Sequence, residues 1–511
     1  MKSQTLPFAL VNNMKLLTKI LRTLSALVSA AMLFTAGANA ADLVWIGGTG
    51  NWNAAGNWSP AQVPTAADNA WVTNNGIYTV TVPAAAAAAA SSLTVGGASG
   101  TQTLSIDRAT VTLNGASVIN ANGQLALTVS QSVLTGAGDL TVNGTLNWAN
   151  GTMSGTGTTT IGSGGVLAIG SGGVTFGRTL NQGGIGTWAG GNLTISAGVA
   201  FNNLAGGTFD ITADGRLSGS ATTPIDNSGL FRQTAGTVGT VVTVPFNNSG
   251  TVQVLAATLS LGLGGTHTGT FSIAPGATMN LAGGSHVLAA SSFVTGAGVL
   301  ALSGGATTLT ASGTFDAGST LSVSAGAGTL SAGCIVTGST LNIGGGVLNY
   351  NSVGTVAAVN LTAGTLGGTS PVTVTGPLTL GGGTVTNALV TASGGLTING
   401  NTTLNGGKLV NPERLPGARA IFPEPTARCS AIYSAPRSIT LLMETPPQAR
   451  APRPSSSTPG VFERQALRRR WGPLPSTFSS LTPAPSKFKP TPCALPSINK
   501  RPASPFSMAA V

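Results

Sequence analysis

Short alternation of apolar and polar residues fills the chain from about Ile77 to Val410. Phrases such as YTVTV, QTLSI and GNLTI carry an apolar side chain at every second position, and most end near Gly, Asn or Ser. A period of two with closely spaced turn residues is typical of short β-strands. The alanine-rich stretch 84–90 is helix-prone. Because it follows Pro83 and lies between strand patterns, we expect a loop or a single turn there.

A longer repeat is superimposed on the strand pattern. The phrases FNNLAGGTFDI, IDNSGLFRQT and FNNSGTVQVL start 24 and 21 residues apart. Short strands and tight turns repeating at this length predict an all-β fold, a parallel β-helix (β-solenoid) over residues 77–410 with roughly 15 coils of about 22 residues. An array of β-sandwiches is the alternative, and it would require longer loops and more aromatic core residues.

The repeated phrases also indicate how neighbouring coils would stack. Equivalent apolar residues would form a continuous interior, and an asparagine at the same corner of each coil would form a ladder of amide hydrogen bonds. The core and corner positions predicted in this way are Phe201, Asn203, Ile225, Asn227, Phe246 and Asn248.

Tryptophan is concentrated just before the repeats. Four of the seven tryptophans, Trp45, Trp52, Trp58 and Trp71, fall within 27 residues. The end of a solenoid exposes an apolar cross-section and unpaired strand edges, so this segment predicts an N-terminal cap over residues 41–76. The alternative is an aromatic platform that contacts carbohydrate, because sugar rings pack well on indole faces.

The same segment contains a pattern of the form W-x-G-G-x-G-x-W…N-W-S…V-P…D. The matching positions are Trp45, Gly47, Gly48, Gly50, Trp52, Asn57, Trp58, Ser59, Val63, Pro64 and Asp68. It resembles the N-terminal segment of large bacterial secreted or surface proteins of the β-strand-repeat, autotransporter-like (adhesin) type. The resemblance implies a Gly/Thr-rich parallel β-helix at the cell surface. It is weakened by the lack of the C-terminal barrel or sorting anchor that such proteins carry.

The first 40 residues have the pattern of a signal peptide. Lys15, Lys19 and Arg22 precede the apolar run TLSALVSAAMLFTAG, and an A-N-A site ends at Ala40. We predict cleavage after Ala40, with Met14 as a plausible true start, and hence a secreted or surface-exposed protein without a transmembrane segment. A membrane anchor is the alternative, although the run is shorter than the ~20 residues that span a bilayer.

The net charge of +11 conceals three unlike segments. Residues 41–410 carry five basic residues and eight Asp, whereas the strongly basic part begins at Asn411. A slightly acidic body without a basic stripe excludes recruitment of nucleic acid by this region. The body also holds a single cysteine, Cys334, which excludes a disulfide framework within it.

Residues 411–511 form a Pro/Arg-rich segment for which we predict no stable fold, because its prolines break both ladders and helices. Read one nucleotide out of register, the codons for 481–494 permit N-S-G-T-V-x-V, which matches the phrase at Asn248. We therefore interpret the tail as out-of-frame translation and the chain as a frameshifted or truncated fragment. A disordered linker and a basic tail that binds peptidoglycan or a membrane surface are the alternatives.

Candidate chemistry in the body is sparse. Asp210 and Asp214, in FDITADGRL, form the closest acidic cluster; their even spacing could place both on one strand face, although ADG is also a plain turn. His267 and His286, 19 residues apart, are expected to stack as solvent-facing residues. No cofactor, metal or nucleophile motif is recognised.

These observations predict an exported, non-enzymatic β-solenoid of adhesin type that contacts polysaccharide, matrix or a cell surface. The alternatives are a carbohydrate-active β-helix enzyme, such as a polysaccharide lyase or hydrolase, and a carbohydrate-binding module. An enzyme would require two or three clustered carboxylates. The sequence does not indicate an oligomeric state.

Overall fold

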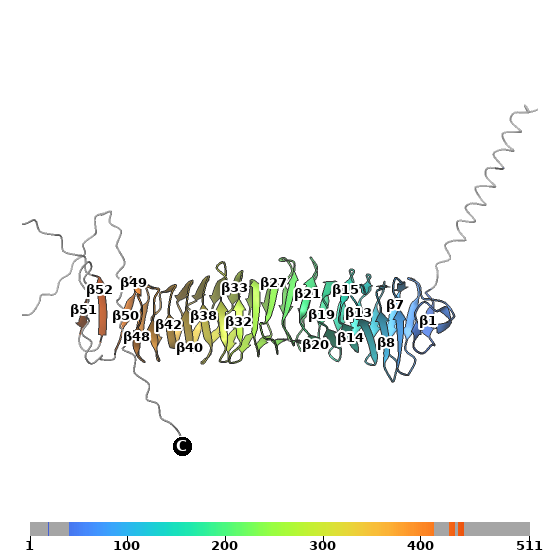
Figure 1. The fold of residues 1–511 in the computed structure, drawn as a ribbon, viewed down its shortest axis with the longest axis horizontal. Helices are drawn as coiled ribbons and strands as arrows, with labels where there is room; N and C mark the ends of the chain where they lie inside the picture. Colours follow the sequence, from blue (N-terminus) through green and yellow to red (C-terminus); the bar gives the residue numbers. More distant parts are fainter. Residues whose placement is uncertain (1–18, 20–39, 413–428, 435–437, 444–511) are drawn as a thin grey trace, which may run out of the picture. The chain divides into compact units, whose positions relative to one another are not determined.

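A computed structural model describes residues 19, 40–412, 429–434 and 438–443. It is all-β, and residues from 42 to 410 form a parallel β-solenoid (Figure 1). There are about 16 turns, so the predicted fold is confirmed. The structure divides between Leu300 and Ala301 into two units. The predicted signal peptide and most of the tail lie outside the described residues.

Successive turns of the first unit build three parallel sheets. The first turn differs, because its third strand, β3 (Trp58–Ser59), pairs antiparallel with Val44 and Trp45. Sheet 1 contains β1 (Asp42–Trp45), β4 (Asn69–Val72), β7 (Ser92–Val95), β10 (Ser117–Ile119), β13 (Leu140–Val142), β16 (Thr159–Ile161), β19 (Leu180–Gln182), β22 (Phe201–Asn203), β25 (Ile225–Asn227), the end of β27 (Thr240–Asn248), β30 (Gly265–His267) and β33 (Ser285–Leu288).

Sheet 2 follows one corner further along each turn. It contains β2 (Gly50–Asn51), β5 (Tyr78–Val82), β8 (Gln102–Ile106), β11 (Gly123–Leu127), β14 (Thr145–Trp148), β17 (Val166–Ile169), β20 (Ile185–Trp188), β23 (Thr208–Ile211), β26 (Leu230–Gln233), β28 (Thr251–Val254), β31 (Thr270–Ile273) and β34 (Phe293–Thr295).

Sheet 3 completes each turn. It contains β6 (Ala87–Ala90), β9 (Thr110–Leu113), β12 (Val133–Thr135), β15 (Gly151–Ser154), β18 (Val174–Gly177), β21 (Gly191–Ile195), β24 (Gly215–Gly219), the start of β27, β29 (Thr258–Leu263) and β32 (Thr278–Leu281). β6 corrects the expectation of a loop or turn at 84–90. Ala88 and Ala90 point into the interior, and pairing with β9 overrides helix propensity.

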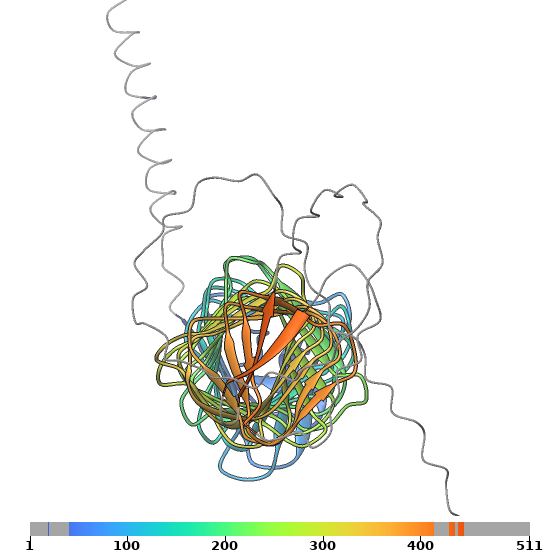
Figure 2. The same ribbon diagram turned by 90° about the vertical axis from the view of Figure 1, so that its left-hand side faces the viewer.

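The second unit repeats this construction from β36 (Thr308–Ala311) to β50 (Lys408–Val410). The end-on view shows its orange strands wrapped around one interior (Figure 2). Two further strands, β51 (Cys429–Ser434) and β52 (Ser438–Met443), pair antiparallel, and β52 lies close to β50. They fall within the tail for which no stable fold is predicted. Residues 413–428, 435–437 and 444–511 lie outside the described residues.

The interior follows from the period of two, because alternate side chains point to opposite faces of a strand. In sheet 1, Phe201, Ile225 and Phe246 lie in register and are fully buried. Phe209 and Phe231 of sheet 2 pack beside them, with Phe231 and Phe246 ring centroids 5.1 Å apart. Equivalent apolar positions of successive coils therefore build one continuous core.

Candidate functional site

Three of the four clustered tryptophans form a plug. Trp45, Trp52 and Trp58 are essentially unexposed, and Trp58 packs edge-on against the other two rings at 5.1 and 4.8 Å. The indole nitrogen of Trp58 donates to the carbonyl oxygen of Trp52 at 2.8 Å, and that of Trp45 donates to Gly48 at 3.0 Å. Buried and mutually packed, these rings present no face to a ligand.

Asp68 binds the backbone of Ala41, the residue just before β1. Its carboxylate accepts hydrogen bonds from the hydroxyl and backbone N–H of Thr65 at 2.5 and 2.9 Å, and from the backbone N–H of Ala41 at 3.1 Å. These bonds, the Thr65 hydroxyl above all, hold the pKa of Asp68 below its usual value. Asp68 thus joins Ala41 to the start of β4.

Trp71 differs from the other three. It occupies the outward position of β4, between buried Ala70 and Val72, and 38% of its surface is exposed. Its indole nitrogen lies 3.4 Å from Oδ1 of Asp42, and the side-chain amide of Asn69 donates to the same oxygen at 2.9 Å. The predicted tryptophan group therefore divides into a buried plug and one exposed ring.

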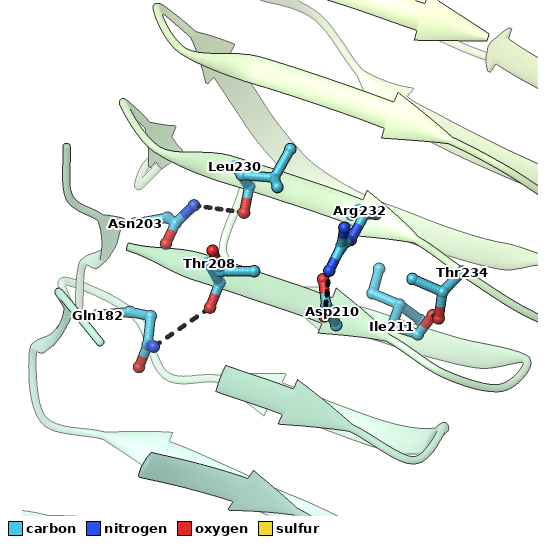
Figure 3. A network of polar contacts seen from close by, with 8 residues as sticks. All are labelled: Gln182, Asn203, Thr208, Asp210, Ile211, Leu230, Arg232 and Thr234. Carbon is cyan, nitrogen blue, oxygen red and sulfur yellow. Dashed lines mark hydrogen bonds and ion pairs between the residues drawn. The ribbon is translucent and has the colours of Figure 1, made fainter. Parts of the chain in front are cut away.

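The predicted asparagines form a ladder inside the coils, on the same side of sheet 1 as the phenylalanines. Asn203 donates its amide to Asn227 at 2.7 Å, and Asn227 donates to Asn248 at 2.8 Å. Each amide also donates to a backbone carbonyl at the corner with sheet 2, Asn203 to Leu230 at 3.0 Å (Figure 3). All three side chains are buried, so the ladder satisfies corner carbonyls that water does not reach.

A histidine pair continues this ladder. His267 lies in register with Asn248, and its Nε2 is 3.1 Å from Nδ1 of His286. Nε2 of His286 lies 3.0 Å from the carbonyl oxygen of Gly283. Burial lowers the pKa of His267 to about 3 and that of His286 to about 4. The expected stacking is present, but the expectation of solvent-facing side chains is wrong, because both point into the interior.

Asp210 and Asp214 do not form a carboxylate pair. β23 ends at Ile211, so Asp214 lies at the corner beyond it rather than on its face. Arg232 of the next coil binds both oxygens of Asp210 at 2.7 Å (Figure 3). Asp214 accepts from the backbone N–H groups of residues 237–239, which lower its pKa to about 2.

Each aspartate therefore has a structural role. Asp210 joins two coils through an ion pair, and Asp214 organises the loop before β27. Gly239, the nearest donor to Asp214 at 2.7 Å, has φ +119, and a Cβ there would lie 1.9 Å from the carbonyl oxygen of Thr258. This corner therefore requires glycine.

The outer face of sheet 1 carries a second set of amide contacts, which the sequence analysis missed. Asn202 donates to Asn181 at 2.8 Å, and Asn247 donates to Asp226 at 2.9 Å. The signal was available, because each residue directly precedes a corner asparagine or glutamine in its phrase. Buried Arg178 was also missed; it donates to the carbonyls of Gly138 and Thr158, at 2.6 and 3.2 Å.

Metal or thiol chemistry receives no support from the geometry of the described body. Among the residues that the structure describes, no three His, Cys, Asp or Glu side chains are grouped so as to hold a metal ion. Cys334 is buried, and burial raises its pKa to about 11. A thiol held protonated in this way is a poor nucleophile.

No family model matches the chain, and neither a curated protein nor a solved structure matches it. A helix with the length and hydropathy needed to cross a bilayer is absent from the described part of the chain.

Proposed function

We propose that this chain is an exported, non-enzymatic β-solenoid of adhesin type, which presents a stiff polar surface to polysaccharide, matrix or a cell surface. The observation that carries the proposal is the outer face of sheet 1. There, side chains of adjacent coils are hydrogen-bonded to one another, Asn181 to Asn202 and Asp226 to Asn247. The two side chains of each pair lie one strand spacing, ~4.8 Å, apart and, being already paired, lose little entropy on binding a partner.

The state of the aspartates favours this function over an enzyme. Glycan hydrolysis needs one carboxylate free to give a proton and a second free to act as base or nucleophile. Asp210 is held by Arg232, and Asp214 is held by three backbone N–H groups at a pKa of about 2. Asp214 is therefore ionised near neutral pH, and both carboxylate oxygens of Asp210 are engaged by Arg232, so the two do not form an acid and base pair.

The slightly acidic body makes nucleic acid an unsuitable partner. Export to the outside or to the bacterial surface rests on the signal-peptide pattern of residues 1–40. We place the protein there as part of the same proposal.

The test uses the purified full chain. Incubation with pectin, alginate and β-glucan, with and without calcium, should release no reducing or unsaturated ends. The same preparation should bind to at least one of immobilised polysaccharide, matrix protein or intact cells. Release of new chain ends would overturn the non-enzymatic function, and failure to bind any of these surfaces would overturn the adhesin function.

A further inference from the structure

Trp71 is a large aromatic residue at a position where the fold does not need one. Its strand buries Ala70 and Val72, so the core is complete without the indole ring. The residues in register with it on the neighbouring strands are Val44 and Thr94, both much smaller. An exposed indole has an apolar face and a polar N–H edge, the combination that makes tryptophan frequent at contact surfaces.

The nitrogen at the edge of the ring joins a hydrogen-bonded chain of polar side chains. Oδ1 of Asp42 accepts from the indole nitrogen of Trp71 and from the amide of Asn69. Asn69 in turn accepts a hydrogen bond from the hydroxyl of Ser92 at 2.7 Å. This chain of hydrogen bonds crosses three adjacent strands, β1, β4 and β7, and reaches the edge of the indole.

Two parallel rows result on the outer face of sheet 1. Asp42, Asn69 and Ser92 lie in register and form the polar row. Trp71, flanked by Val44 and Thr94, lies two residues further along the strands, which is roughly 7 Å away. A flat apolar ring thus lies next to a line of hydrogen-bonding groups, all of them at least partly exposed.

We propose that this surface binds a neutral polysaccharide whose sugars carry equatorial hydroxyl groups, as in a β-1,4-linked glucan. Such a pyranose presents its axial C–H bonds as an apolar face, which packs on the indole of Trp71. Its hydroxyl groups, which lie at the ring edge, then reach Asp42 and Asn69. The inference rests on the proposed function and names its ligand class and contact residue.

Charge selects against acidic polysaccharides at this surface. Asp42 is an exposed carboxylate beside the ring, and the body as a whole contains eight aspartates against five basic residues. A uronate group next to Asp42 would be repelled, whereas a sugar hydroxyl donates to it. The site should therefore prefer a glucan to a polygalacturonate of the same length.

The experiment measures binding of cellohexaose and of galacturonate hexamer to the full chain by calorimetry. We expect cellohexaose to bind and the acidic hexamer to bind more weakly. Trp71→Leu keeps an apolar side chain but removes the flat ring, so binding of cellohexaose should weaken about tenfold or more. Trp71→Phe keeps a ring and should recover part of this loss.

Val118→Ala is the matched control. Val118 occupies the same outward row two coils further on, in register with Thr94, and lies outside the polar row. The Val118→Ala substitution removes apolar surface from the same face and should leave the binding of cellohexaose unchanged. Asp42→Ala removes the acceptor of both hydrogen bonds and should weaken binding, which a purely hydrophobic contact at Trp71 would not require.

The outcomes separate this inference from the proposed function. Binding of cellohexaose that survives Trp71→Leu, or equal binding of the acidic hexamer, overturns the Trp71 site and leaves the adhesin function intact. If neither sugar binds but the protein still attaches to cells or matrix protein, the Trp71 site is again overturned and the adhesin function is kept. Loss of attachment to every surface would overturn both.

Discussion

At the scale of single residues, the buried histidines show how the interior limits titration. His267 and His286 are fully buried, and removal from water disfavours their charged forms. The hydrogen bond between their rings uses one nitrogen as donor and one as acceptor, which requires at least one neutral ring. Their pKa values of about 3 and about 4 follow from this burial.

Stability should therefore fall as the pH falls below about 6.5. The unfolded histidines take up protons near pH 6.5, whereas the folded ones do so only near pH 3 to 4, so the unfolded state gains protons first. Each histidine contributes a loss of up to about 1.4 kcal/mol per pH unit within this window. Denaturant unfolding at pH 8, 6 and 5 measures the slope.

The matched variant is His267→Asn, which extends the amide ladder of Asn248 with a group that does not titrate. Its stability should depend less steeply on pH between 6.5 and 4 than that of the parent. Equal slopes in the two proteins would show that the histidines are not neutral in the fold.

At the scale of strands and corners, the asparagine ladder makes stability depend on groups that are shared between coils. Asn227 both accepts from Asn203 and donates to Asn248, so it serves three coils. Asn227→Ala would remove the hydrogen-bond donor to the side-chain oxygen of Asn248 and one of the two acceptors of the Asn203 amide, and all three asparagine side chains are buried. We expect a loss of roughly 2–4 kcal/mol in unfolding free energy, measured by denaturant titration.

Asp226→Ala is the control for this change, because Asp226 precedes Asn227 on β25 and faces outward. Its contact with Asn247 is exposed to solvent, and its loss should hardly alter stability. If both variants melted together with the parent, the amide ladder would have no energetic role.

The ladder and the core column were predictable because their phrases repeat. FNN, IDN and FNN align without gaps, so register follows from sequence alone, and Phe201, Ile225 and Phe246 stack as expected. Trp45 and Trp71 belong to no repeated phrase. Trp71 pairs with Val44 rather than Trp45, and this single step of register sends one ring inward and the other outward.

The prediction that Asp210 and Asp214 share one strand face was wrong for a related reason. Even spacing places Asp210 and Asp214 on one face only if the strand continues through both, and β23 ends at Ile211. Where a coil turns is determined by contacts with the next coil, here Arg232 and the backbone at Gly239. A single phrase does not contain that information.

At the scale of the whole molecule, the question is what the tail contributes. In the second unit, Leu378 and Leu380 are buried, whereas Leu396 and Ile398, in register with them in the next coil, are more exposed. β52 lies close to β50 of that last coil. The sequence predicts that residues 411–511 add little stability. If β51 and β52 cover the last coil, the same residues should instead stabilise it.

Deletion of residues 411–511 decides between these possibilities. From the composition of the tail we expect the melting temperature to change by no more than about 2 °C. Circular dichroism melts of the full and shortened chains measure it. A fall of about 10 °C would show that the strand pair stabilises the last coil, and would contradict out-of-frame translation of this segment.

The hydrogen bond between Ala41 and Asp68 has a consequence for maturation. If a signal peptidase cuts after Ala40, the amide nitrogen of Ala41 becomes a charged ammonium group 3.1 Å from a carboxylate that is almost fully buried. A neutral hydrogen bond would turn into a charge-assisted one. Such a cut would then strengthen a contact that joins the start of β1 to β4. The contribution of this contact to stability is measured by comparing the melting temperatures of chains that begin at Ala40 and at Ala41, each with Asp68 and with Asp68→Asn.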